Sequence, residues 1–213
     1  PAVKASKNLD WIPKEVLTAA QKNYVAAYCS GAYIEPLPTY PDSKLDPAKA
    51  AIQFSAKKTE SLDLNRAKLE GDVQISQGYR QVRSDEAVFD QASRKVSLNG
   101  NVQFREPGLL LLGSEAELDS YNREVRIKNA TYLLHESAVR GSARQLTRNQ
   151  DSRILIEDAT YTTCDPSDNA WQLITNKIHI SQTEGFATIE NARLEVGKIP
   201  IFFLAFFKFS ISF

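Results

Sequence analysis

A repeat of 29 residues constrains the fold of this chain more than any other feature of its sequence. The peptide Gly71-Asp72-Val73 recurs as Gly100-Asn101-Val102, and Asn129-Ala130-Thr131-Tyr132 recurs as Asp158-Ala159-Thr160-Tyr161, each 29 residues later. One period holds about two strands and two turns, and a unit of that size cannot bury its own apolar face. The repeat therefore predicts strand pairs that stack, with their apolar faces lining one continuous interior.

Short segments within the repeat alternate apolar and polar residues. Val73-Gln74-Ile75, Val102-Gln103-Phe104 and Ile178-His179-Ile180 have the period of two that is typical of a strand with one apolar face. Asn99-Gly100-Asn101 predicts a tight turn, because Asn and Gly tolerate positive φ.

The first 50 residues have a different composition and are expected to form an arm. Pro13 followed by a run through Tyr24 predicts a short helix with proline in its first turn. Residues 35–50 hold four of the nine prolines, which predicts an extended tether. We expect the sheet to cover residues 51–198, and an aromatic-rich, strand-like segment to follow over 199–213.

Charge and hydropathy exclude several classes of protein. Basic and acidic residues balance at 26 each, so no global basic field favours nucleic acid. The longest apolar run, from Ile199 to Phe207, is about half the roughly 18 residues that a membrane helix needs. The chain starts at Pro1 without a Met or an apolar leader, so we expect any signal peptide to have been removed.

The residues that catalysis or metal binding would need are not grouped in the sequence. His135 and His179 are the only histidines, and neither lies at zinc-ligand spacing from a Cys or an acidic pair. The sequence contains no glycine-rich phosphate loop, nucleophile elbow or H-E-x-x-H motif. We therefore expect no enzyme activity, no cofactor and no metal site.

Cys29 and Cys164 are the only cysteines. They are compatible with two buried free thiols, with one mutual disulfide, or with two bonds to partners outside this chain. Sequence spacing does not choose among these, because a disulfide depends on distance in three dimensions.

Three segments together resemble a known family over most of the chain. They are Cys29-Ser30-Gly31-Ala32-Tyr33 with Glu35-Pro36, Ala159-Thr160-Tyr161-Thr162-Thr163-Cys164 with Trp171, and Asn191-Ala192-Arg193-Leu194 leading to Val196-Gly197-Lys198-Ile199-Pro200-Ile201-Phe202. They resemble the OstA-like domain of the LptD family of outer-membrane lipopolysaccharide-assembly proteins. The family's tail carries further prolines where this chain has Ala205 and Ser210.

The resemblance implies an all-β fold, an elongated and open V-shaped β-jellyroll with an apolar interior, on the periplasmic side of a Gram-negative outer membrane. In that family the jellyroll receives lipopolysaccharide from an LptA-like periplasmic bridge protein. It passes the lipid to a β-barrel that holds an LptE-like plug lipoprotein. The resemblance also implies that Cys29 and Cys164 pair with two barrel cysteines that this chain lacks.

A lipid path would require an apolar lining, and the period-two segments supply candidates for contact with the lipid A acyl chains. The candidates are Val73, Ile75, Phe89, Val102, Phe104, Leu110, Leu112, Leu118, Ile127, Ile154, Ile156, Ile178 and Ile180. Val102, Phe104, Leu110 and Leu112 share the even phase and are expected on one face. The alternatives are a structural β-solenoid or adhesin-like module with a dry core, and, third, an enzyme acting on envelope polysaccharide.

The joint to the bridge protein would require an open sheet edge, which can accept a strand from another chain. The first strand after the proline tether is the expected edge, with Ile52, Gln53 and Phe54 at its centre.

Overall fold

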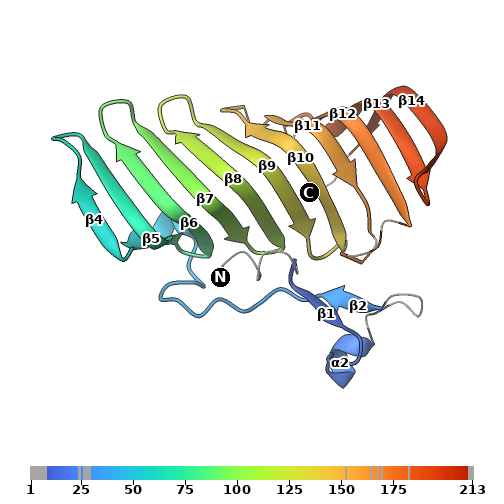
Figure 1. Ribbon diagram of the computed structural model, residues 1–213, viewed down its shortest axis with the longest axis horizontal. Coiled ribbons are helices and arrows are strands. Elements are labelled where there is room, and N and C mark those ends of the chain that lie inside the picture. Colours follow the sequence, from blue (N-terminus) through green and yellow to red (C-terminus); the bar gives the residue numbers. More distant parts are fainter. Residues whose placement is uncertain are drawn as a thin grey trace.

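The repeats form one long antiparallel sheet (Figure 1). The computed structural model describes residues 9–23, 25, 30–151, 153–163, 165, 166, 168, 170–181 and 183–210. Within these residues the sheet has 12 strands in the order β14-β13-β12-β11-β10-β9-β8-β7-β6-β5-β3, with β4 also pairing with β5. Neighbours in sequence are therefore neighbours in space, and the elongated all-β fold that the sequence predicts is confirmed.

Most strands span 9 to 12 residues. The first two strands of this sheet are shorter, namely β3 (Gln53–Ser55) and β4 (Lys58–Ser61). The others are β5 (Arg66–Gln77), β6 (Arg80–Asp90), β7 (Lys95–Glu106), β8 (Leu109–Asp119), β9 (Glu124–Leu134), β10 (Val139–Arg148), β11 (Arg153–Tyr161), β12 (Trp171–Ser181), β13 (Phe186–Val196) and β14 (Ile199–Ser210).

The 29-residue repeat encodes an irregularity in the middle of a strand. The non-glycine residues with positive φ in β5, β7, β9, β11 and β13 are Asp72, Asn101, Asn129, Asp158 and Asn191. Each is followed by a buried small residue: Val73, Val102, Ala130, Ala159 and Ala192. The register of the β5–β6, β6–β7 and β7–β8 pairs shifts at these levels, as expected for β-bulges.

The tight turn predicted at Asn99-Gly100-Asn101 is wrong, because these residues lie inside β7. Gly100 and Asn101 have φ of 72° and 45°. A bulge and a tight turn both use this left-handed conformation, so the same local signal indicates either one.

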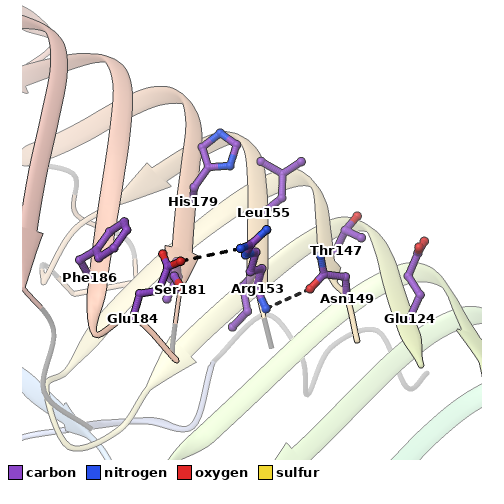
Figure 2. Close-up of a pocket in the computed structure, with 11 residues that line it drawn as sticks. Glu124, Thr147, Asn149, Arg153, Leu155, His179, Ser181, Glu184 and Phe186 are labelled. Atoms are coloured by element: carbon purple, nitrogen blue, oxygen red, sulfur yellow. Dashed lines mark hydrogen bonds and ion pairs between the residues drawn. The ribbon is translucent and has the colours of Figure 1, made fainter. Parts of the chain in front are cut away.

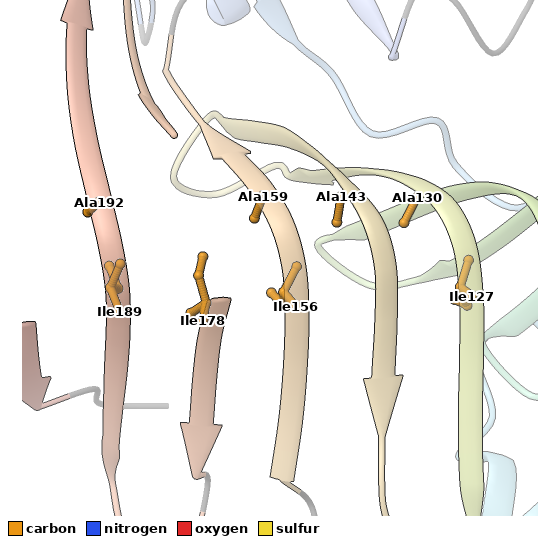
Figure 3. Close-up of a cluster of buried hydrophobic side chains, with 8 residues drawn as sticks. All are labelled: Ile127, Ala130, Ala143, Ile156, Ala159, Ile178, Ile189 and Ala192. Carbon is orange, nitrogen blue, oxygen red and sulfur yellow. The ribbon is translucent and has the colours of Figure 1, made fainter. Parts of the chain in front are cut away.

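Small side chains line up across the sheet where the strands bend (Figure 3). Ala130, Ala143, Ala159 and Ala192 belong to one buried cluster with isoleucines at the next inward positions. In β12 the equivalent place is taken by Thr175, whose hydroxyl donates to the carbonyl of Glu190 at 2.7 Å. We call this line of small residues the seam; the bend along it gives the open jellyroll form that the resemblance implies.

The N-terminal arm lies beside the sheet (Figure 1). It contains β1 (Trp11–Pro13), α2 (Ala19–Lys22) and β2 (Gly31–Tyr33), followed by a 3-10 turn at Pro47–Lys49. The expected helix starting at Pro13 is wrong in extent, because Pro13 is the last residue of β1 and pairs with Gly31 of β2. The helix begins only after Thr18, which forms a capping box with Gln21. In the described part of the chain, no helix is long and apolar enough to span a bilayer.

Candidate functional site

One row of side chains crosses the sheet from β5 to β14, and every member is apolar. Each member lies directly opposite the next in the strand register. In order they are Leu69, Ala87, Leu98, Ala116, Ile127, Leu146, Ile156, Ile178, Ile189 and Phe207. At about 4.8 Å per strand, the row is roughly 40 Å long. We call the face that carries it the inner face.

Burial on the inner face decreases from the seam toward the ends of the strands. Val73 after the bulge in β5, Ala159 at the seam and Ala87 in the apolar row are 1%, 0% and 0% exposed. Further out, Phe89 and Phe104 are only half-buried, and Leu118 is 41% exposed. A sealed core would cover both regions, so the inner face is an apolar surface that is open along its length.

The opposite face carries charge. Lys68 bonds with Glu86 at 2.8 Å, and Lys128 bonds with Glu115 at 2.8 Å. These pairs lie between hydrogen-bonded strands and are partly exposed, so each contributes little to stability. The sheet is therefore amphipathic, with water on the outer face.

Eleven of the thirteen candidate lining residues lie on the inner face. They are Val73, Ile75, Phe89, Val102, Phe104, Leu118, Ile127, Ile154, Ile156, Ile178 and Ile180. Contact of these residues with lipid remains a prediction.

Leu110 and Leu112 lie on the outer face, so the expectation that they share a face with Val102 and Phe104 is wrong. The β7–β8 turn has two residues, and Glu106 pairs with Leu109 across it. Between this turn and the bulge, odd positions on β8 therefore lie opposite even positions on β7, and Phe104 lies opposite Leu111. Leu110 instead packs with Leu9, Tyr33 and Leu133 under the N-terminal arm.

Sequence reasoning missed seven members of the row: Leu69, Ala87, Leu98, Ala116, Leu146, Ile189 and Phe207. Alternation along Val96-Ser97-Leu98 was available as a signal. The bulges hide the others, because one inserted residue exchanges the inward and outward phases along the strand.

The two ends of the sheet are open edges. β3 pairs only through Gln53, Phe54 and Ser55 with β5, and the side chains of Ile52 and Phe54 are both 64% exposed. At the other end, β14 pairs with β13 and exposes Ile201, Phe203 and Phe206. Both ends offer strand edges that could pair with another chain.

Two hollows lie along the rim formed by the turns after β4, β6, β8, β10 and β12, which we call the first rim. One is about 480 Å³, lined by Phe89 and Val96 together with Arg66, Arg94 and Lys95. The other is about 400 Å³ and lies between β10, β11 and β12 (Figure 2). There Arg153 points toward Glu184, with 3.8 Å between nitrogen and oxygen.

Cys29 and Cys164 lie outside the described residues, so their expected pairing stays a prediction. Their described neighbours Ser30 and Asp165 are joined by a hydrogen bond from the Ser30 hydroxyl. Among the described residues, no group of three or more His, Cys, Asp or Glu side chains could hold a metal ion.

Comparison with known proteins gives consistent relatives. LPS-assembly protein LptD of Pseudomonas syringae pv. syringae (strain B728a) is 42% identical over 207 residues, 96% of this chain. LptD of Pseudomonas fluorescens (strain Pf-5) is 40% identical over 206 residues. The chain spans 22% of the length of each of these relatives.

A solved structure and a family model complete the comparison. The crystal structure of LptH, the LptA homologous periplasmic component of the lipopolysaccharide transport device from Pseudomonas aeruginosa, aligns at 15% identity with a TM-score of 0.43. It covers 54% of this chain and 84% of that chain. The model of the family described as LptA/(LptD N-terminal domain) LPS transport protein matches residues 53–186. The chain therefore belongs to the LptA/LptD N-terminal-domain family of LPS transport proteins.

Proposed function

We propose that this chain is the periplasmic, lipid-conducting part of an outer-membrane lipopolysaccharide-assembly protein. The unbroken apolar row from Leu69 to Phe207 carries the proposal. Each buried methylene is worth about 0.8 kcal/mol, so a 12-carbon acyl chain in water costs roughly 10 kcal/mol. An apolar face that is open along its length offsets this cost while the sugars of lipid A stay in water.

The two open edges supply the connections that transport needs. In this proposal an LptA-like bridge protein adds a strand at β3, where Gln53 and Phe54 are exposed, and the row continues into it. Beyond β14 the chain leads to a β-barrel with its LptE-like plug, and Cys29 and Cys164 pair with cysteines of that barrel. The length of the relatives, more than four times that of this chain, leaves room for such a barrel.

A dry-core module is the competing structural reading, and the decrease in burial toward the strand ends argues against it. Two aspartate substitutions separate the readings. Phe104→Asp places a carboxylate where it can reach water, so its cost in unfolding free energy should be about 1 kcal/mol. Ala159→Asp places one at the fully buried seam and should cost several kcal/mol.

The binding measurement uses lipid A and the stable variant. Phe104→Asp should weaken lipid A binding, whereas Gln103→Asp, on the outer face of the same strand, should not. Unchanged lipid A binding by Phe104→Asp, or severe unfolding of that variant, would contradict an open lipid-binding face.

A further inference from the structure

Three exposed arginines on the first rim have no carboxylate partner among the described residues. They are Arg94 in the turn after β6, Arg123 in the turn after β8, and Arg148 at the end of β10. They come from three consecutive hairpins, so neighbours in this set are separated by about 10 Å, the width of two strands. The turns also touch: the Ser120 amide donates to the Arg94 carbonyl at 2.9 Å.

Arg148 marks where this rim meets the apolar lining. It lies opposite Val125 on β9 and Ile154 on β11. Both neighbours pack against the inner cluster, so Arg148 shares the inner face with them. The exposed guanidinium of Arg148 therefore lies directly beside the outermost apolar side chains of the inner face.

The backbone at the other two positions favours glycine over arginine. Arg94 and Arg123 are the fourth residues of four-residue turns, with φ of 56° and 52°. Gly185 holds the same place in the turn after β12, with φ of 68°. A side chain in this region costs backbone energy that glycine avoids. Both side chains are exposed, so burial does not account for the arginines, although the Arg94 guanidinium lies 6.0 Å from the centroid of the Tyr121 ring.

Three carboxylates of the rim are engaged by their own turns. Asp90 accepts the Ser93 amide at 3.0 Å, and Asp119 accepts the amides of Tyr121 and Asn122 at 3.0 and 2.9 Å. Asp63 bonds the Arg66 Nε at 2.7 Å, which occupies that cation. The guanidinium groups of Arg94, Arg123 and Arg148 thus remain available to an outside anion.

The hollow of about 480 Å³ brings apolar side chains of the inner face and an arginine of the rim together in one place. Ala67, Phe89 and Val96 of the inner face line it, and Arg94 lines it as well, beside the carboxylates Asp63 and Asp90 that are engaged by their own turns. An apolar lining with a cation beside it fits an amphiphile whose head carries a negative charge. Arginine binds phosphate through two parallel hydrogen bonds, which sets it apart from lysine.

We propose that Arg94, Arg123 and Arg148 form a phosphate-binding lip that holds the phosphorylated sugar head of a lipid whose acyl chains lie on the inner face. This inference rests on the proposed function and adds to it the recognition of the head group. The spacing of the arginines along successive hairpins offers a phosphate one site after another as the lipid moves along the face.

The test compares the binding of two lipids, bisphosphorylated lipid A and the same lipid after removal of both phosphates. The variant combines Arg94→Gly, Arg123→Gly and Arg148→Gln. The glycines suit the positive φ of both turns, so its thermal stability should equal or exceed that of the parent chain. A matched control combines Ala138→Gly, at φ 51° in a turn on the opposite rim, with Lys49→Gln, Arg83→Gln and Lys177→Gln at exposed sites elsewhere.

The lip variant should bind phosphorylated lipid A at least about tenfold more weakly than the parent, the effect of losing one charge-assisted hydrogen bond. It should bind the dephosphorylated lipid as the parent does, and the control should match the parent on both lipids. Parent-like binding of phosphorylated lipid by the variant would overturn the lip, as would an equal loss by the control or an equal loss on both lipids. Failure of the parent chain to bind either lipid would instead refute the proposed function.

Discussion

Asp10 and Arg105 lie 95 residues apart in sequence and are joined by two parallel hydrogen bonds, at 2.6 and 2.7 Å. Arg105 is near the end of β7, and Asp10 directly precedes β1. His135 Nε2 lies 3.0 Å from the same carboxylate. This contact fastens the N-terminal arm to the sheet, next to the apolar packing of Leu9 and Tyr33 against Leu110 and Leu133.

The contact of Asp10 with Arg105 and His135, which we call the latch, should weaken in acid. Burial raises the pKa of Asp10, but the hydrogen bonds from His135 and Arg105 and the Arg105 charge outweigh burial, so the net pKa is lowered. A carboxyl with a lowered folded pKa contributes stability above its unfolded value, about 3.9, and loses it as the pH falls through the folded pKa. Protection of the arm from hydrogen exchange should therefore persist at pH 5 to 7 and fall below about pH 4.

Asp10→Asn provides the matched control for that measurement. It keeps the shape of the side chain but removes its charge, and should destabilise arm docking by about 2 kcal/mol at neutral pH. The side chain of residue 10 cannot titrate in this variant, so it should no longer change the hydrogen-exchange protection of the arm between about pH 5 and pH 3. An unaltered acid response in Asp10→Asn would show that other groups control the docking of the arm.

The bulge residues should tolerate glycine and reject β-branched side chains. Asn129 has φ of 49°, and its side-chain amide donates to Ser114 Oγ at 2.9 Å. Asn129→Gly and Asn129→Val both lose that hydrogen bond, but only valine is strained at positive φ. We expect Asn129→Val to be less stable than Asn129→Gly by about 1–2 kcal/mol in urea unfolding. Equal stabilities would contradict the role assigned to this position of the repeat.

The first sheet edge should lose its partner when one of its amides is removed. Successive amides of an edge strand point in opposite directions, so one of Gln53 and Phe54 donates toward β5 and the other toward the open side. Proline at each position, tested separately, should give one variant that binds the LptA-like bridge protein more weakly without loss of stability. Unchanged affinity in both variants would place the joint elsewhere.

The sequence predicted the strand pairs, because the repeat and the alternation at Val73, Ile75, Ile178 and Ile180 are local signals. It could not predict which residues share a face across a turn. Phe104 and Leu110 have the same parity, yet the two-residue turn between β7 and β8 places them on opposite faces. Such assignments depend on turn length and on bulges, which are set by pairing between strands.

The arm was harder to predict for a related reason. Pro13 has the local chemistry of a helix start, but pairing with Gly31 on a distant segment places it in a strand. The latch at Asp10 could not be read from sequence either, because nothing near Asp10 in the chain indicates that Arg105 and His135 will meet it. Contacts over such separations are a property of the assembled sheet.

Site-specific photo-crosslinking to lipopolysaccharide in cells tests most directly whether the inner face carries lipid. A photo-reactive side chain at Phe104 or Ile154 would lie on the inner face, and one at Gln103 or Leu155 would occupy the adjacent outward position of the same strand. We expect lipopolysaccharide adducts from Phe104 and Ile154 and none above background from Gln103 and Leu155. Equal labelling from both faces, or no adduct from either inner position in a folded and expressed protein, would contradict this expectation.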